Sequence, residues 1–453
     1  MDKMAIYNRL PVWGQNLACY SEGGRIKRTR YGKDFWRFLA EYESHAEWSY
    51  EQLCDYRDAR LRKMIHHCYD TVPYYTKLFN EGGINPDSIK TLDDLKVLPI
   101  LTKDDVKANI DDLISSAVSK SEIKIHQTGG TTGAGLNFHT TNSEEAEQWA
   151  VWWRYRRAHG ISLDTWCGNF GGKVIVQLSA DKPPYWRINI PGKQIFFSGY
   201  HINEDHAKLY ADSIKKRELQ WIHGYPSNIA NLAFAMMQHG IVVPLIWVSI
   251  GAENLYEYQR QYIKKAFCTD PIQHYGLTEG VANISENTEG LLTVDEDFSS
   301  VEFIDTSENN EYRIIGTTLT NFTMPLLRYD TGDLAQISML GKHNNSGRVV
   351  DALCGRNNEY ILLPNGVGVG AAAISLILNK FQEIKETQLV QVTETIISVQ
   401  VVLSDSGIKV DEHRLMSALR ERFGSEMQIH IEYVDSIQKT KNGKYRLVLS
   451  ELK

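Results

Sequence analysis

The sequence lacks any run of about 18 consecutive apolar residues, which is the length that a membrane-spanning helix needs. It also lacks a signal-peptide pattern, because Asp2 and Lys3 are followed by an apolar run that Asn8, Arg9 and Pro11 interrupt. Its six cysteines form no C-x-x-C pair, which argues against a disulfide framework or a zinc module and suits a reducing compartment. We therefore expect a cytoplasmic protein.

Positive charge is not in excess either. The formal net charge is −7, whereas a nucleic-acid-binding protein is expected to present a basic face. The hydrophobic content of 42% is ordinary for a soluble protein. A length of 453 residues exceeds what one hydrophobic core usually supports. We expect at least two domains and no nucleic-acid partner.

A glycine- and threonine-rich stretch at residues 127–135 stands out from this ordinary background. It contains four glycines and three threonines, and such a segment can bring backbone amides and hydroxyls close to a polyphosphate. It is not a Walker A loop, because Leu136 and Asn137 stand where that loop needs Lys and Ser or Thr. A flexible surface turn is the alternative interpretation.

The first two thirds of the chain alternate between short apolar runs and helical patterns. Strands are predicted at residues 138–141, 174–178, 221–223 and 245–250. Helices are predicted at residues 50–70, 143–155 and 229–236, and Thr102 is expected to cap a further helix. This alternation indicates an α/β fold.

The remainder of the chain changes character twice. Short alternating segments in residues 291–340 predict a small antiparallel or barrel-like subdomain. After Gly355, the pattern predicts strands at 360–363, 388–403 and 428–433 and helices at 371–380 and 411–423. We therefore place a domain boundary between residues 354 and 355.

Four further stretches carry chemical groups. Residues 274–279 offer a hydroxyl and a carboxylate after a glycine turn, which suits Mg²⁺ with ATP, and residues 329–333 offer a carboxylate suited to a ribose. Residues 355–358 contain an arginine that can contact phosphate, and residues 439–446 contain several lysines. Each stretch alone is better explained as a turn or a solvated surface.

Together and in this order, the five stretches resemble the adenylate-forming superfamily, which includes acyl-CoA synthetases and peptide-synthetase adenylation domains. The resemblance covers Tyr50 to Arg446. Within the superfamily, the chain is most similar to the phenylacetate–CoA ligase and CapK-like branch. The segments typical of that branch are residues 10–17, 72–75, 98–103 and 224–227.

The resemblance implies a large N-terminal domain of several subdomains, residues 1–354, that binds ATP and a carboxylate. It also implies a small, mobile α+β lid domain, residues 355–453. The lid would rotate about the boundary between the two half-reactions, with Asn358 at the hinge position, where many relatives have Asp or Lys.

The resemblance also assigns roles around ATP. The β- and γ-phosphates would be bound by Thr128, Gly129, Gly130, Thr131, Thr132 and Gly133. Thr278 would contact phosphate, and Glu279 would hold Mg²⁺. The chain departs from many relatives at Ala134-Gly135-Leu136, where they have a Lys-Pro pair, so a second phosphate contact is in doubt.

The remaining implied site residues surround the nucleoside and the acyl group. Gly251, Ala252 and Glu253 match a segment beside the adenine and acyl pocket, flanked by His274, Tyr275 and Gly276. Asp333 would bind the ribose hydroxyls, and Arg356 would lie near the ribose and phosphates. Lys444 would neutralise the α-phosphate during attack by the carboxylate, because fixed positive charge stabilises such a transition state.

Three functions remain open at this stage. The leading one is ATP-dependent activation of a carboxylate to an acyl-adenylate, followed by transfer to CoA or another acceptor. The second is an amide-forming ligase that joins a carboxylate to an amine in capsular or exopolysaccharide biosynthesis. The third is a catalytically silent binding module, which the joint presence of Glu279, Asp333, Arg356 and Lys444 disfavours.

The N-terminal arm, residues 4–33, combines scattered apolar residues with a basic run. Peripheral contact with an anionic membrane surface would suit that composition. Packing of the apolar residues on the protein's own domain is the interpretation that we favour, because it needs no second partner.

Overall fold

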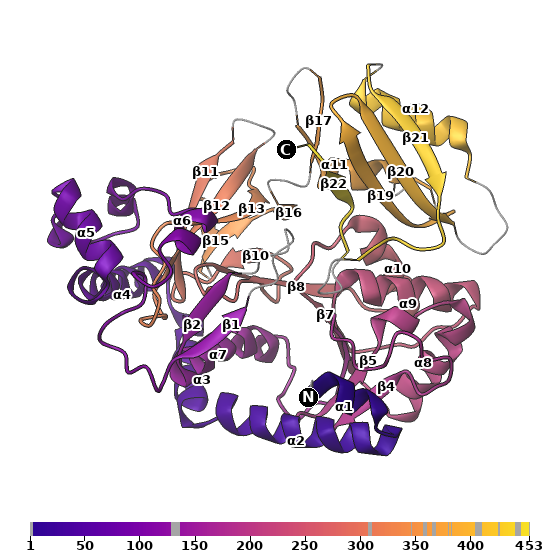
Figure 1. Cartoon of the computed structure of the whole chain (residues 1–453), viewed down its shortest axis with the longest axis horizontal. Coiled ribbons are helices and arrows are strands. Elements are labelled where there is room, and N and C mark those ends of the chain that lie inside the picture. Colours follow the sequence, from indigo (N-terminus) through magenta and orange to yellow (C-terminus); the bar gives the residue numbers. More distant parts are fainter. Residues whose placement is uncertain are drawn as a thin grey trace. The chain divides into compact units, whose positions relative to one another are not determined.

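The computed structural model of the chain is drawn in Figure 1. It describes residues 3–127, 136–306, 310–345, 347–356, 360–364, 368–378, 380–381, 383–403, 410–424, 426–439 and 445–452. These residues form two compact units. Unit 1 comprises residues 1–19, 165–272 and 354–453, and unit 2 comprises residues 20–164 and 273–353.

Unit 1 contains a mostly parallel sheet with helices packed on it. Its strands are β3 (Cys167–Phe170), β4 (Trp186–Asn189), β5 (Gln194–Phe197), β6 (Trp221–Gly224) and β7 (Trp247–Ile250), in the order β7-β6-β3-β5-β4. Only β4 runs antiparallel to its neighbour among these strands. The helices are α8 (Glu204–Lys216), α9 (Pro226–Gln238) and α10 (Glu257–Phe267), preceded by the 3-10 turn η4 (Gly199–His201). Their apolar side chains share one buried cluster with the sheet.

The predicted strands at 221–223 and 245–250 are confirmed as β6 and β7, but the strand predicted at residues 174–178 is wrong. That segment has no regular secondary structure. The strand that pairs with β6 on the side away from β7 is β3. Val176 is buried, but Val174 is 36% exposed and Leu178 62%, so only part of the run is buried. A short apolar run alone does not specify whether it pairs in a sheet.

The C-terminal part of unit 1 is a small α+β arrangement. Its elements are β17 (Tyr360–Leu362), β18 (Gly368–Gly370), α11 (Ala371–Leu378), β19 (Ile384–Thr393), β20 (Ile396–Leu403), α12 (Glu412–Phe423), β21 (Gln428–Tyr433) and β22 (Val448–Ser450). Strands β21-β20-β19-β22 form one sheet, and β17 pairs with β18. The run predicted as one strand at 388–403 is two antiparallel strands, β19 and β20, joined by a turn. The predicted mobility of this part stays a prediction.

Unit 2 begins with helices whose ends follow the local sequence signals. They are α3 (Lys33–Ser44), α4 (Tyr50–Thr71), α5 (Pro73–Gly82), α6 (Lys103–Ala108) and α7 (Asn142–Ala158), with 3-10 turns η1 (His45–Glu47), η2 (Pro86–Ser88) and η3 (Asp93–Val97). The predicted cap at Thr102 is confirmed, since its hydroxyl accepts the Asp105 amide in a capping box. Val72 is extended because Pro73 follows it, and Pro73 opens α5.

The strands of unit 2 are antiparallel. A hairpin is formed by β1 (Lys124–Gln127) and β2 (Asn137–Thr140), and one sheet contains β8 (Pro271–Gly276), β9 (Asn283–Glu286), β10 (Leu292–Val294), β14 (His343–Asn344) and β15 (Gly347–Val350). Strands β11 (Ser299–Asp305), β12 (Glu311–Thr318) and β13 (Tyr329–Gln336) form another, and β16 (Ala352–Arg356) follows. The antiparallel strands predicted for residues 291–340 are therefore confirmed, but β10 and β11–β13 belong to different sheets, and a separate antiparallel or barrel-like subdomain stays a prediction.

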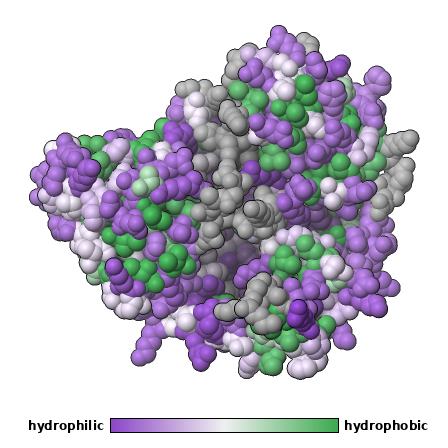
Figure 2. All heavy atoms as spheres, viewed as in Figure 1, coloured by the Kyte–Doolittle hydropathy of each residue, from purple (hydrophilic) through white to green (hydrophobic). Residues whose placement is uncertain are grey.

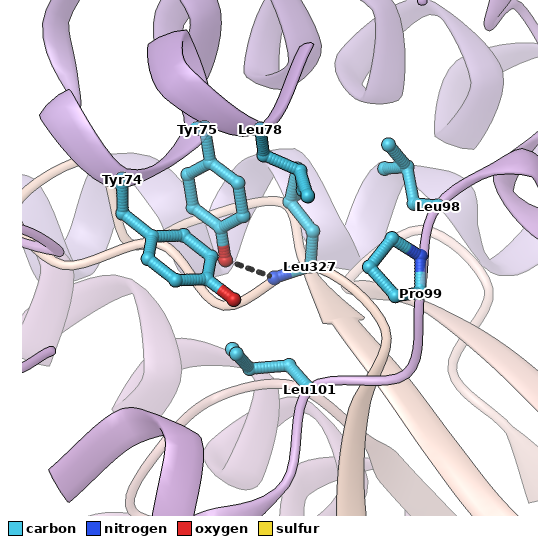
Figure 3. A pocket seen from close by; sticks show the side chains of 7 residues that line it. All are labelled: Tyr74, Tyr75, Leu78, Leu98, Pro99, Leu101 and Leu327. Atoms are coloured by element: carbon cyan, nitrogen blue, oxygen red, sulfur yellow. Dashed lines mark hydrogen bonds between the residues drawn. The ribbon is translucent and has the colours of Figure 1, made fainter. Parts of the chain in front are cut away.

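The two N-terminal segments typical of the resembled branch meet in the core of unit 2. Residues Tyr74, Tyr75, Leu78, Leu98, Pro99, Leu101 and Leu327 surround a cavity of about 10 Å³ (Figure 3). The Tyr75 hydroxyl accepts a hydrogen bond of 2.9 Å from the Leu327 amide. Such a volume holds about one water molecule, so segments 72–75 and 98–103 serve packing here rather than ligand binding.

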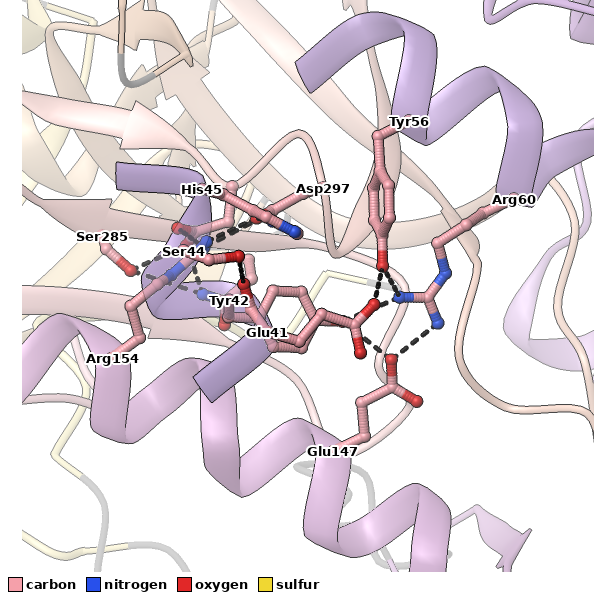
Figure 4. A network of polar contacts seen from close by, with 12 residues as sticks. Glu41, Tyr42, Ser44, His45, Tyr56, Arg60, Glu147, Arg154, Ser285 and Asp297 are labelled. Atoms are coloured by element: carbon pink, nitrogen blue, oxygen red, sulfur yellow. Dashed lines mark hydrogen bonds and ion pairs between the residues drawn. The ribbon is translucent and has the colours of Figure 1, made fainter. Parts of the chain in front are cut away.

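A buried polar network joins the helices of unit 2 to the turn after β10 (Figure 4). Arg60 of α4 donates to Glu147 of α7 at 2.6 Å, and the Tyr42 hydroxyl donates to the same carboxylate at 2.8 Å. His45 donates to Asp297 at 2.7 Å, and Arg154 also binds Asp297. Because these charges are buried, removal of either partner leaves an uncompensated charge.

Candidate active site

The glycine- and threonine-rich loop connects the two strands of the β1–β2 hairpin. Residues 128–135, including the six predicted phosphate-binding residues, lie outside the described part of the chain. The ends of the loop are nevertheless defined, since Gln127 pairs with Asn137 across the hairpin. Leu136 is buried, and α7 starts five residues after β2 begins, capped by Thr141. The loop is therefore held at both ends by paired strands.

Two predicted site residues of unit 2, Tyr275 and Asp333, are in direct contact. The Tyr275 hydroxyl on β8 donates a hydrogen bond of 2.9 Å to Asp333 on β13. Gly332 adopts a φ of 72°, a left-handed conformation that favours glycine and explains the T-G-D sequence. The Thr331 hydroxyl accepts the Asp333 amide at 3.1 Å. Asp333 is thus oriented from both its backbone and its side chain.

Thr278 and Glu279 occupy the turn that follows β8. Thr278 is exposed, whereas Glu279 is buried. Burial raises the pKa of Tyr275, and the negative charges of Asp333 and Glu279 raise it further. Tyr275 is therefore a neutral donor beside two carboxylates. Unit 2 thereby brings Tyr275, Glu279 and Asp333 together.

His274 faces the opposite side of β8 from Tyr275, as successive residues of a strand do. Its ring stacks on Tyr155 with centroids 5.4 Å apart, and its Nε2 donates to Asn283 Oδ1 at 2.9 Å. Asn283 Oδ1 also accepts from Trp152, and its amide nitrogen donates to Asp295. Asn283 is thus oriented as an acceptor toward His274.

Burial lowers the pKa of His274 to about 3, and the nearby Arg156 charge lowers it further. His274 is therefore neutral at physiological pH. Gly276 packs against the same group, because a Cβ there would lie 2.7 Å from Asn283 Oδ1. The residue pattern of the sequence did not point to Asn283, which sits in an unremarkable polar strand.

Glu253, in unit 1, is a buried carboxylate that binds two backbone amides. It accepts hydrogen bonds from Tyr445 at 2.7 Å and from Ser227 at 3.3 Å. Burial raises the pKa of Glu253, while the Tyr445 amide and the Lys439 charge act in the opposite direction. Ala252 has a φ of 68°, a strained conformation for a residue with a Cβ. The predicted segment Gly251–Glu253 is thus tightly constrained.

The residues on either side of the C-terminal lysine segment contact the same region of unit 1. Lys439 donates to Asn228 at 2.7 Å, near the start of α9, and Tyr445 is bound to Glu253. Lys444 itself, with residues 440–443, lies outside the described residues. Tyr445, the residue after Lys444, therefore contacts the predicted Gly251–Glu253 segment.

The turn between β6 and α9 has a packing explanation for its residues. A Cβ at Gly224 would lie 2.5 Å from the Phe170 carbonyl oxygen, so only glycine fits between β6 and β3. Pro226 opens α9. Burial is the main cause that raises the pKa of Tyr225 to about 12, and the negative charge of Glu253 is the second. Tyr225 is therefore a neutral side chain beside that carboxylate.

Arg356 and Asn358 lie at the predicted domain boundary. Arg356 ends strand β16, and its backbone alone is described. Asn358, at the predicted hinge, lies outside the described residues. Across the described ranges, no three His, Cys, Asp or Glu side chains are grouped so that they could hold a metal ion by themselves. A metal at Glu279 would thus depend on ligands from elsewhere.

Comparisons with known proteins agree with these features. Residues 361–451 match the CapK C-terminal domain family. Over 454 residues, the chain is 26% identical to Protein CapK of Staphylococcus aureus, covering 99% of each chain. It is 24% identical to the phenylacetate-coenzyme A ligase of Escherichia coli, covering 88% of this chain and 95% of that one.

A solved structure shares the fold. A crystal structure of 2-hydroxyisobutyryl-CoA ligase in the postadenylation state matches with a TM-score of 0.65 and 16% identity, covering 87% of this chain and 89% of that one. The predicted fold class, α/β with a large N-terminal and a smaller C-terminal domain, is thereby confirmed. Over most of its length the chain is therefore similar to CapK and to phenylacetate–CoA ligases, and these similarities support a ligase of that adenylate-forming branch.

Proposed function

We propose that the protein activates a small carboxylate with ATP and then transfers the acyl group to CoA or another acceptor. A carboxylate oxygen attacks the α-phosphorus, the bond to the β-phosphate breaks, and pyrophosphate leaves. The observation that carries this proposal is the grouping of Tyr275, Glu279 and Asp333 in unit 2 of an adenylate-forming fold. This donor set has the chemistry for an ATP ribose and a phosphate-bound cation.

In this proposal, Asp333 accepts the ribose hydroxyls and Thr278 donates to phosphate. Glu279 supplies one carboxylate to Mg²⁺, which arrives with ATP and neutralises phosphate charge. A single carboxylate suffices, because Mg²⁺ keeps several waters and takes its other ligands from the phosphates. Residues 128–133 bind the β- and γ-phosphates, and Arg356 contacts the ribose and phosphates.

Lys444 stabilises the charge that develops on the α-phosphate. The support for placing it near the acyl site is the hydrogen bond between Glu253 and the next residue, Tyr445. Gly251, Ala252, His274 and Gly276 shape the adenine and acyl pocket in this proposal. The predicted cytoplasmic location and the rotation of residues 355–453 stay predictions.

A second function differs from the first in the acceptor of the acyl group, and one observation favours it. The similarity to Protein CapK extends over 99% of both chains, further than the similarity to the phenylacetate–CoA ligase. Amide formation on an amine, in capsular or exopolysaccharide biosynthesis, is therefore the alternative to thioester formation. A silent binding module is the third possibility.

The experiment is carboxylate-dependent ATP–pyrophosphate exchange over a panel of acids, followed by product mass with CoA or amines present. A thioester or an amide product identifies the acceptor class. Lys444→Ala is expected to abolish exchange, because its cation acts only in the transition state, whereas Lys441→Ala retains it. Glu279→Gln is expected to raise the Mg²⁺ concentration required. No exchange with any acid would favour the silent module.

A further inference from the structure

We propose that helix α2 (Val12–Arg30) docks the protein on an anionic membrane surface. The contact is a stripe of five side chains, here called the α2 stripe. Its members are Trp13, Leu17, Tyr20, Lys27 and Arg28. The proposal goes beyond the ligase function and does not depend on it.

The first half of the α2 stripe is apolar and exposed. Trp13 is 71% exposed, Leu17 61% and Tyr20 50%. These positions are spaced i, i+4 and i+7, so they lie on one face of the helix. Ile6, within α1 (Lys3–Arg9), and Leu10, directly after it, are exposed as well. The packing of the arm on its own domain, which we favoured from the sequence, is therefore wrong for these side chains.

The protein is contacted by another face of α2, which includes the buried residues Gly14, Gln15 and Gly23. Gln15 is buried and accepts a hydrogen bond from Arg187, and Asn16 accepts the Ile188 amide at 3.0 Å. Both partners belong to β4. A helix on a water-exposed surface normally buries its apolar face. The α2 stripe instead leaves three large apolar side chains in water, and a second, apolar partner would cover them.

The second half of the stripe is basic. Lys27 and Arg28 follow Trp13 by 14 and 15 residues in the same helix, which places them within about 100° of the apolar side chains around the helix axis. Both are exposed. The only acidic residue of α2, Glu22, pairs with Arg25 at 2.6 Å and lies on another face. Arg30 is occupied by Glu145.

Exposed apolar anchors beside unopposed cations are the pattern of a helix that lies in a membrane interface. A second copy of this chain is a poorer occupant, because a parallel symmetric contact would bring Lys27 and Arg28 against like charges, and an antiparallel one would set them against the apolar end of the stripe with no acidic partner. None of the helices in the described ranges is long and apolar enough to cross a membrane, so the contact is peripheral. On the face shown in Figure 2, apolar residues gather in several small groups among hydrophilic ones.

The test is flotation of the full-length protein with vesicles of phosphatidylcholine, alone or with about one third phosphatidylglycerol. Binding is expected to the anionic vesicles only and to weaken with salt. Trp13→Ser with Leu17→Ser is expected to lower the partition coefficient at least about tenfold. Lys27→Glu with Arg28→Glu is expected to lower it by a similar factor.

Matched controls use residues of the same type on other elements. Ile246→Ser replaces an apolar residue that is 53% exposed, and Lys215→Glu with Lys216→Glu reverses two exposed cations at the end of α8. Both controls should bind vesicles as the unsubstituted protein does. Circular dichroism melting confirms that each variant folds, and ATP–pyrophosphate exchange in solution should be unchanged by the stripe variants.

Three outcomes would overturn the proposal. The first is the absence of binding to either kind of vesicle, and the second is equal binding to neutral and anionic vesicles. The third is self-association in sedimentation that Trp13→Ser abolishes, since a second copy would then cover the stripe. Absence of ATP–pyrophosphate exchange in the unsubstituted protein would contradict the ligase function. It would not affect the result for vesicle binding.

Discussion

The hydroxyl of Tyr275 donates a hydrogen bond of 2.9 Å to the carboxylate of Asp333, 58 residues further along the chain. This contact orients the carboxylate that we assign to the ribose of ATP. Burial and the charges of Asp333 and Glu279 keep the phenol protonated by raising its pKa.

Tyr275→Phe is expected to raise the KM for ATP about three- to tenfold with little change in kcat, because one hydrogen bond to the ribose-binding carboxylate is lost. Steady-state kinetics of pyrophosphate release would measure this. Tyr69→Phe removes another phenol, bound to Asn80, and serves as the control. If Asp333 binds the ribose, the effect of Tyr275→Phe should shrink with 2′,3′-dideoxy-ATP. An effect of equal size with both nucleotides would contradict that role.

His274 is expected to stay neutral between pH 5 and pH 8, because burial lowers its pKa to about 3. A histidine with a folded pKa below its unfolded value of about 6.5 binds a proton more readily when unfolded. Its contribution to stability is therefore complete above that value and declines as pH falls toward 3. NMR titration of the His274 ring would test this. A midpoint near 6.5 in the folded protein would exclude the buried site.

Glu253→Ala is expected to speed hydrogen exchange at the amides of Ser227 and Tyr445 about tenfold, because both lose a charged acceptor. Mass-spectrometric exchange of the folded protein would measure it. Glu253→Gln keeps an acceptor oxygen and should give a smaller effect. Glu257→Ala, which removes an exposed carboxylate four residues away, should leave both amides unchanged. Unchanged protection in Glu253→Ala would show that these bonds do not hold the C-terminal segment.

Asp297→Asn is expected to destabilise the protein by about 1–3 kcal/mol, since buried Arg154 would lose one of its two carboxylate partners and keep only Asp295. Denaturant unfolding would measure the change. Asp104→Asn removes an exposed carboxylate and should not shift the midpoint. A loss under about 1 kcal/mol for Asp297→Asn would show that Asp295 alone compensates the Arg154 charge.

The same carboxylate predicts acid sensitivity. Burial raises the pKa of Asp297, but the Arg154 charge and the His45 hydrogen bond outweigh it and lower the pKa to about 2. A depressed folded pKa contributes stability above the unfolded value of about 3.9. That contribution should be lost as pH falls from about 4 through 2. In Asp297→Asn this part of the pH dependence should disappear.

Local sequence determined much of the secondary structure. The cap at Thr102, the helix end before Pro73 and the strand at residues 428–433 all appear where the sequence predicts them. These features depend on neighbours within a few residues, and caps and proline act over that range. The order of the chemical stretches also indicated the ligase branch, because each stretch is a short motif.

The tertiary structure decided which residues meet. The contact of Glu253 with Tyr445 spans 192 residues, and the alignment of His274 by Asn283 depends on Trp152 and Asp295. The orientation of α2 likewise followed from the bonds of Gln15 and Asn16 to β4. Composition does not reveal such pairings, because they depend on packing between distant segments. The sequence by itself therefore determined the elements and the enzyme class, and only the folded chain decided which face of α2 is exposed and which carboxylates share Tyr275.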